Sequence, residues 1–257
     1  MFIPLKDYNP TRRIAVVTIL FILLNFSVFV YQSYLSNEYL KKPLLSSDLQ
    51  PLRWPSSLEY FVLKDGLIPQ EIKGMQNVEI PVGTDRWGNA VIFSRQVSPL
   101  LSLLFSIFMH GSWLHLLGNM LFLWIFGNNI EDRLGPIKFI FFYLLCGIGA
   151  SLVHVLFNLD SLTPVIGASG AVSGVMGAYL LLFPKARIRT LVFVFVLVTT
   201  MDIPAAVFLV IWFVFQFFYA GGGASIAWLA HVGGFIIGMI ILKIFLERKK
   251  PLLQILP

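Results

Sequence analysis

Apolar runs bounded by Lys and Arg are the feature that most limits how this chain can fold. The first run covers residues 14–34 and follows Lys6, Arg12 and Arg13. Of the 257 residues, 57% are hydrophobic and only 12% are charged. A soluble domain carries about 25% charged residues, and an apolar stretch of about 20 residues can cross a bilayer as a helix. The sequence therefore predicts an all-α membrane protein with several spans.

Basic residues at the ends of the apolar runs give the expected orientation, because Lys and Arg concentrate in cytoplasmic loops. Further spans are expected near residues 112–127, 137–157, 169–183, 205–218 and 225–246. Their basic flanks alternate along the chain, which predicts six transmembrane helices with both termini in the cytoplasm. Two shorter apolar runs, 99–109 and 191–198, are expected to lie in the membrane interface or to re-enter the membrane.

Polar residues and prolines concentrate between the first and second predicted spans. We expect residues 35–98 to form a long outside loop, with a cytoplasmic N-terminus at 1–13 and a cytoplasmic tail at 247–257. The membrane domain would then be 14–246, with its core at 99–246. The net charge of +6 reflects the basic flanks of the spans and predicts no nucleic-acid partner. We expect an integral multi-pass protein of a bacterial cell (inner) membrane, in contact with membrane lipid.

Three of the apolar segments contain polar residues, which are costly inside a bilayer. Ser169 stands in a Gly-Ala-Ser-Gly turn that opens one predicted span, and His231 lies near the start of another. His115 and Asn119 lie one helical turn apart on a third span. In the predicted topology all three helix starts lie on the outer side. The four side chains are therefore expected at one depth.

This set of residue types predicts nucleophilic catalysis. A serine hydroxyl needs a neighbouring base to attack a carbonyl, and histidine is the usual base at neutral pH. Ser169 and His231 are therefore the expected nucleophile and base. The backbone N–H groups of Ser169 and Gly170, at a helix start, are expected to stabilise the oxyanion. The side chains of Asn119 and His115 are expected to add donors at the same place.

Glycines indicate that the two catalytic helices approach closely. The predicted fourth span carries Gly170, Gly174 and Gly177 on one face, and the sixth carries Gly234 and Gly238 in a GxxxG pair. Small residues at this spacing let membrane helices pack backbone against backbone. A close approach is what a hydrogen bond between Ser and His side chains requires.

Other polar residues receive structural interpretations. No Asp or Glu stands close to His231 in the sequence, and Asp160 and Asp202 are candidate partners by elimination only. A Ser–His dyad is therefore favoured over a triad. Gln216 is interpreted as a polar anchor, and His110 is expected to face interfacial water. No cofactor and no metal are predicted.

The strongest sequence signal comes from three segments: HGSWLHLLGN (110–119), GASGAVSGVMG (167–177) and AHVGGFIIG (230–238). In this order they resemble the signatures of rhomboid intramembrane serine proteases, and the resemblance covers roughly residues 99–246. It implies a six-helix core and a Ser169–His231 dyad. It also implies an oxyanion site at Asn119, His115 and the Ser169 backbone, and substrates that are transmembrane proteins cut in or near their spans.

Glu131 and Gly135 are similar to a structural loop position of that family. At one position the sequence departs from the pattern: some members carry a tyrosine four residues after the nucleophile, stacked on the base histidine, and here Ser173 stands there. The departure leaves open what orients His231.

Two other functions remain open. One is a non-proteolytic rhomboid-like protein that binds membrane clients, and the intact Ser169 and His231 argue against it. The other is a small transporter. Transporters commonly carry inverted repeats and midplane sites, whereas this sequence shows no repeat and its polar cluster lies toward the outside.

Overall fold

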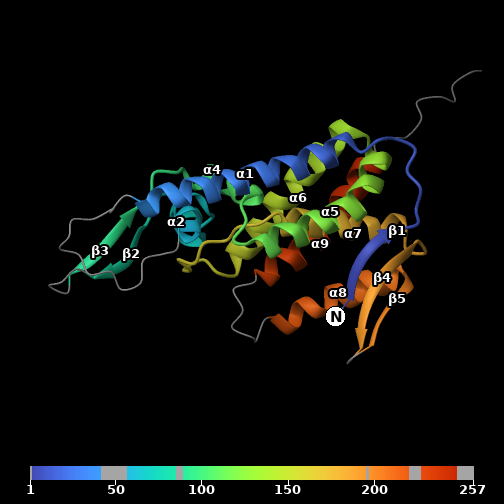
Figure 1. Cartoon of the computed structure of the whole chain (residues 1–257). Helices are drawn as coiled ribbons and strands as arrows, with labels where there is room; N and C mark the ends of the chain where they lie inside the picture. The colour runs from blue at the N-terminus through green and yellow to red at the C-terminus, as the bar shows by residue number, and fades with distance from the viewer. Residues whose placement is uncertain (1, 42–56, 85–88, 195–196, 220–226, 248–257) are drawn as a thin grey trace, which may run out of the picture.

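The computed structural model describes residues 2–41, 57–84, 89–194, 197–219 and 227–247, which are mostly helical (Figure 1). The helices are α1 (Val16–Lys41), α2 (Ser57–Asp65), α3 (Pro69–Gly74), α4 (Pro99–Phe105), the 3-10 turn η1 (Ser106–Phe108), α5 (Trp113–Leu134), α6 (Pro136–Leu156), α7 (Ser169–Leu182), α8 (Ala205–Phe218) and α9 (Trp228–Glu247). The strands are β1 (Phe2–Asp7), β2 (Glu79–Thr84), β3 (Ala90–Ser94), β4 (Arg187–Val194) and β5 (Leu197–Pro204).

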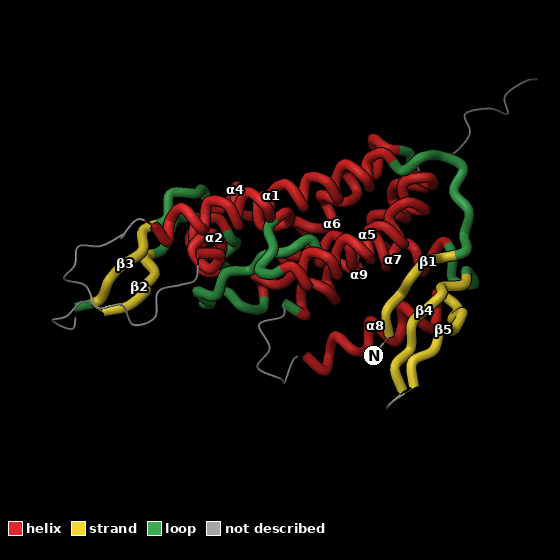
Figure 2. Tube along the Cα trace, viewed as in Figure 1, coloured by secondary structure: helices red, strands yellow, loops and turns green. Residues whose placement is uncertain are grey.

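Helix α7 is the centre of the bundle. It packs between α5, α6 and α9, while α1 runs along one side and α8 lies at the edge beside a small sheet (Figure 2). Every residue from Gly170 to Tyr179 is buried. This stretch is rich in Gly, Ala, Ser and Val, and such small side chains let several helices surround it at short range.

Several helices are suited to the membrane. Within the described residues, three are long and apolar enough to cross it: Val16–Leu35, Pro136–Leu156 and Trp228–Leu246. The pair formed by 99–108 and α5 passes the same test together but is bent by 79°. Helices α7 and α8 are apolar and shorter. The prediction of a membrane protein with several apolar helices is confirmed. Helix α5 continues to Leu134, beyond the predicted end at Gly127.

The all-α prediction was incomplete, because the chain also forms two small antiparallel sheets. Strands β1, β4 and β5 form one of them, in that order, at the end of the bundle away from the β2–β3 hairpin (Figure 1). The described residues of the run 191–198 belong to strands β4 and β5. Ile188, Thr190 and Val192 alternate along β4 and are buried, so one face of this sheet packs on the helices.

The N-terminal strand is tied to the bundle through Asp7. Tyr179 Oη donates to Asp7 Oδ2 over 2.8 Å, and Asn129 Nδ2 donates to the same oxygen over 2.7 Å. Burial raises the pKa of Asp7, and these two hydrogen bonds oppose that shift. Helices α5 and α7 therefore hold β1 in place.

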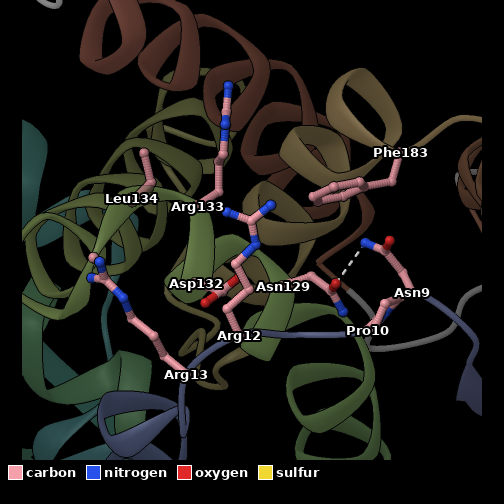
Figure 3. Close-up of a pocket in the computed structure, with 10 residues that line it drawn as sticks. Asn9, Pro10, Arg12, Arg13, Asn129, Asp132, Arg133, Leu134 and Phe183 are labelled. Atoms are coloured by element: carbon pink, nitrogen blue, oxygen red, sulfur yellow. Dashed lines mark hydrogen bonds between the residues drawn. The ribbon is translucent and has the colours of Figure 1, made fainter.

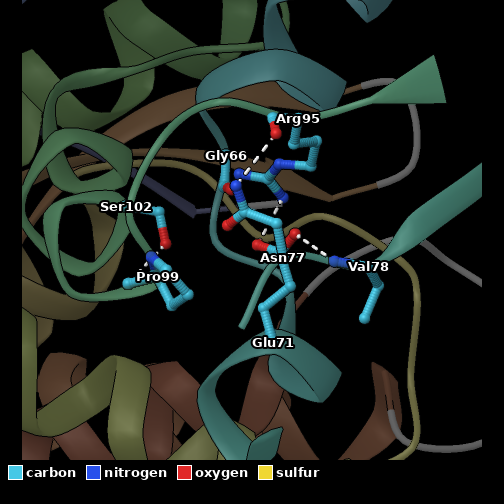
Figure 4. A network of polar contacts seen from close by, with 7 residues as sticks. All are labelled: Gly66, Glu71, Asn77, Val78, Arg95, Pro99 and Ser102. Carbon is cyan, nitrogen blue, oxygen red and sulfur yellow. Dashed lines mark hydrogen bonds and ion pairs between the residues drawn. The ribbon is translucent and has the colours of Figure 1, made fainter. Parts of the chain in front are cut away.

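The polar segment after α1 packs around a buried ion pair (Figure 4). Arg95 Nη1 lies 3.1 Å from Glu71 Oε2, with both side chains fully buried, and Arg95 Nη2 donates to the carbonyl of Gly66 over 2.6 Å. The backbones of Leu67 and Val165 also exchange two hydrogen bonds. This segment is therefore fixed to the loop that leads into α7.

Glu131 caps the N-terminus of α1. Its carboxylate accepts hydrogen bonds from the N–H groups of Val17 and Thr18, at 2.9 and 2.7 Å, and from the Thr18 hydroxyl at 2.8 Å. A carboxylate at a helix start satisfies free N–H donors and complements the helix dipole. Gly135 ends α5 with a positive φ of 81°, and α6 begins directly after it. The end of α5 thereby anchors the start of α1.

We predict that Glu131→Ala destabilises the protein by about 2–3 kcal/mol, because buried donors at the start of α1 lose their acceptor. Thermal unfolding in detergent measures the effect. Asp160→Ala is the control, since Asp160 pairs with Lys73 while its side chain is 83% exposed, and a change within about 0.5 kcal/mol is expected. Equal unfolding temperatures for Glu131→Ala and the wild type would contradict the capping role.

Candidate active site

Ser169 begins α7 directly after a tight turn. Gly167 has a φ of 124°, a conformation that side-chain-bearing residues rarely adopt, and its N–H donates to the Ser106 carbonyl over 2.8 Å. The Val172 N–H donates to the Ala168 carbonyl over 2.9 Å. The N–H groups of Ser169 and Gly170 come earlier in the chain than the N–H of Val172. No carbonyl within the helix is therefore placed to accept a hydrogen bond from them.

Ser169 and His231 are in hydrogen-bond contact. The distance from Ser169 Oγ to His231 Nε2 is 2.8 Å, although the two residues come from separate helices, α7 and α9. The structure thus brings together the two residues that the sequence singled out as nucleophile and base. The hydroxyl can donate its proton to Nε2 if that nitrogen is unprotonated.

The glycine faces explain how the two helices come so close. A Cβ atom on Gly238 would overlap the backbone of Gly174, and one on Gly234 would overlap the carbonyl of Gly170. A Cβ on Gly177 would overlap the Phe235 carbonyl in the same way. Both helices therefore need glycine where they cross, and the predicted glycine interface is confirmed.

Gln216 of α8 holds the other nitrogen of the imidazole. Its Oε1 lies 2.7 Å from His231 Nδ1, and its Nε2 donates to the Trp212 carbonyl over 3.0 Å. Because the amide nitrogen is used on Trp212, the amide oxygen faces the histidine, and an oxygen can only accept. His231 Nδ1 therefore carries the proton, and Nε2 presents its lone pair to Ser169. The centroids of the Trp212 and His231 rings lie 6.0 Å apart.

These contacts answer the question that Ser173 left open. The Ser173 hydroxyl donates to the Ser169 carbonyl over 2.6 Å, inside its own helix. Gln216 and Trp212 supply the orientation of His231 from α8. Sequence reasoning interpreted Gln216 only as an anchor. The signal was present, since among the described residues of α8 it is the single amide or charged side chain.

The two carboxylates considered by elimination bind elsewhere. Asp160 pairs with Lys73 over 2.6 Å, and Asp202 on β5 pairs with Arg189 over 2.9 Å. The Arg189 guanidinium holds the pKa of Asp202 below its usual value. Neither carboxylate contacts His231, whose Nδ1 is occupied by Gln216.

His115 packs against the turn before Ser169. A Cβ on Gly167 would lie 2.8 Å from both Cε1 and Nε2 of the His115 ring. Asn119, one turn along α5, is 8% exposed, and its Nδ2 finds no acceptor among the described residues. The expectation that His110 faces interfacial water was wrong. His110 is fully buried, and the centroid of its ring lies 5.0 Å from the centroid of the His115 ring.

Comparisons with known proteins identify a family and several relatives. A family model described as the Rhomboid domain matches residues 97–248. Rhomboid protein 1, mitochondrial, of Saccharomyces cerevisiae is 33% identical over 153 residues, which are 56% of this chain and 41% of that protein. RHOMBOID-like protein 4 of Arabidopsis thaliana is 29% identical over 171 residues, which are 62% of this chain and 37% of that protein. Rhomboid-like protein 11, chloroplastic, of the same plant is 43% identical over 67 residues, which are 26% of this chain and 24% of that protein.

The matches span less than half the length of these relatives. Two of the three names place the relative in a mitochondrion or a chloroplast, so they lend no support to the expected bacterial membrane. The match of the family model extends over almost the same residues as the resemblance of the sequence motifs.

We predict that Gly238→Ala destabilises the protein by about 1–3 kcal/mol, because the new methyl overlaps the Gly174 backbone and forces α9 from α7. Thermal unfolding in detergent measures it. Gly118→Ala on α5 is the matched control, since a Cβ there meets no atom within 4 Å. If both substitutions change the unfolding temperature equally, close packing at Gly238 is not what matters.

Proposed function

Because the chain belongs to the rhomboid family, we propose that it is an intramembrane serine endopeptidase that hydrolyses peptide bonds in or near the transmembrane segments of other membrane proteins. The observation that carries the proposal is the 2.8 Å contact between Ser169 Oγ and His231 Nε2. The Gln216 contact adds to it, because it keeps Nε2 free to accept the hydroxyl proton.

In the proposed reaction, Ser169 Oγ attacks the carbonyl carbon of the scissile bond while its proton passes to His231 Nε2. The imidazolium keeps its Nδ1–H donated to Gln216 Oε1 and then delivers the Nε2 proton to the leaving amine. A water molecule next attacks the acyl ester on Ser169, with His231 again accepting a proton. His231 then returns this proton to Ser169 Oγ as the ester C–O bond breaks, so Ser169 is regenerated and the acyl fragment leaves as a carboxylic acid.

The negative charge that develops on the carbonyl oxygen needs donors that are already oriented. We assign this role to the backbone N–H groups of Ser169 and Gly170 and to the side chains of Asn119 and His115. Support comes from Asn119 Nδ2, which has no acceptor in the described part of the chain, and from the contact of the His115 ring with the turn before Ser169.

The proposed topology has six spans, formed by α1, α5, α6, α7, α8 and α9. Both termini are then cytoplasmic, residues 35–98 form an outside loop, and Ser169 lies toward the outer side. The basic residues before α1, after α7 and after α9 support this orientation. Water reaches the site from the outer face, through the region around Ser112 and the loop before Gly167.

The proposed substrates are transmembrane proteins with spans that unwind easily. A peptide bond in an intact helix is shielded by its own hydrogen bonds, so a span must open locally before Ser169 can reach it. Gly, Pro or polar residues within the span favour opening, and a small residue is expected before the cut. A client-binding protein without proteolysis and a small transporter are the alternatives.

We predict that a fluorescent fluorophosphonate labels the wild type and that Ser169→Ala abolishes labelling. Ser173→Ala is the matched control, because this serine lies one turn away and its hydroxyl is bonded to a carbonyl. Gel fluorescence of purified protein in liposomes measures the reaction. A folded wild type that does not label favours the client-binding alternative, and equal labelling of Ser169→Ala removes the dyad.

A second prediction concerns Gln216→Met, which keeps the volume but removes the acceptor of His231 Nδ1. We expect kcat to fall about tenfold, as for a hydrogen bond worth about 1.4 kcal/mol in the transition state, with KM and unfolding temperature little changed. Cleavage of a transmembrane substrate in liposomes gives both constants. Phe215→Leu, at a position 49% exposed on the same helix, is the control. An unchanged kcat would exclude a positioning role for Gln216.

A further inference from the structure

A cavity of about 470 Å³ lies where the turn before α1 meets the end of α5 (Figure 3). Its walls come from the turn before α1, the last residues of α5 and Phe183 after α7. Ser169 begins α7, and its 14 residues span about 21 Å before Phe183 is reached. The cavity is therefore separate from the candidate active site. Its volume falls in the range of about 300–1,000 Å³ typical of small-ligand sites.

The lining carries an excess of positive charge. Arg12, Arg13 and Arg133 line the cavity against a single carboxylate, Asp132. Where the chain is described, none of these three guanidinium groups forms an ion pair, whereas Arg95 and Arg189 each pair with a carboxylate. Three unpaired arginines around one cavity are suited to an anion, and a guanidinium matches the oxygens of a phosphate in a bidentate manner.

The polar wall of the cavity is fixed by its own hydrogen bonds. Asn9 Nδ2 donates to Asn129 Oδ1 over 2.6 Å, and Asn129 Nδ2 donates to Asp7 Oδ2 over 2.7 Å. The Asn129 amide is thus used within the protein, and the carboxylate of Asp7 already has its donors. The arginines are left as the groups able to take an external anion.

The level of the cavity in the membrane indicates the source of that anion. Arg12 and Arg13 come just before Val16, where the first candidate span begins, and Arg133 lies in the last turn of α5. In the proposed topology this is the level of lipid headgroups, and basic pockets between membrane helices bind anionic headgroups at that level. Leu134 and Phe183 add apolar surface to the lining for the part of a lipid below its phosphate.

We propose that this cavity binds the phosphate of an anionic membrane lipid through Arg12, Arg13 and Arg133. The assignment does not depend on the proteolytic function, because the cavity is separate from Ser169 and His231. All three arginines are exposed at this end of the bundle, where a headgroup can reach them, and their guanidinium groups point in different directions (Figure 3).

The test uses the full chain in nanodiscs of phosphatidylcholine, with or without phosphatidylglycerol, and native mass spectrometry of the released protein. The wild type should retain a phosphatidylglycerol molecule. Each of Arg12→Gln and Arg133→Gln should weaken retention about fivefold, and the double variant correspondingly more. Lys138→Gln and Lys185→Gln are the matched controls, because both lysines are exposed near the same end but do not line the cavity. Both should retain the lipid as the wild type does.

A soluble phosphate is the other source of the same chemistry, so inorganic phosphate is added to the nanodiscs that contain only phosphatidylcholine. Thermal stabilisation by inorganic phosphate equal to that by phosphatidylglycerol would overturn the lipid assignment. Equal retention by the arginine and lysine variants would overturn the site itself. If the double glutamine variant fails to fold, Arg12→Lys with Arg133→Lys replaces it. This pair keeps the charge and loses the bidentate geometry, so weakened retention supports the site and unchanged retention contradicts it.

Discussion

The backbone contact between α7 and α9 is the constraint on which the rest of this structure depends. Gly170 and Gly174 face Gly234 and Gly238 so closely that a single methyl group would overlap a backbone atom. Only this approach lets the short hydroxyl of Ser169 and the imidazole from another helix meet at 2.8 Å. In a bilayer no hydrophobic effect drives helices together, so dense packing of small residues has to supply the association.

Contacts at both ends of the bundle hold the surrounding elements in place. The Glu71–Arg95 ion pair orders the segment after α1, and the Leu67–Val165 bridge fixes it to the loop before Ser169. Glu131 anchors α1 at the other end of the bundle. A central helix of small residues has little side-chain surface of its own, so its position is set by these neighbours.

Much of this arrangement could be predicted from local sequence patterns. Apolar runs predicted a membrane protein with several apolar helices, and the spacing of glycines indicated which two would touch. The pairing of β1 with β4 was missed because it joins residues far apart in the chain, and no local pattern reports such a partner. Gln216 and His110 were misjudged for a related reason. Which way a polar side chain of a membrane helix or loop faces depends on the packing of elements far away in the sequence.

The place of Gln216 on α8 has a consequence for how a substrate can enter. Helix α8 is at the edge of the bundle, and Val210, Val214 and Phe217 on it are about half exposed. If a substrate of the proposed protease reached Ser169 by pushing α8 outward, it would also withdraw the Gln216 acceptor from His231 Nδ1. The imidazole then loses its fixed tautomer while the path is open. In the proposed reaction, cleavage would therefore wait until α8 returns and Gln216 again accepts the Nδ1–H of His231.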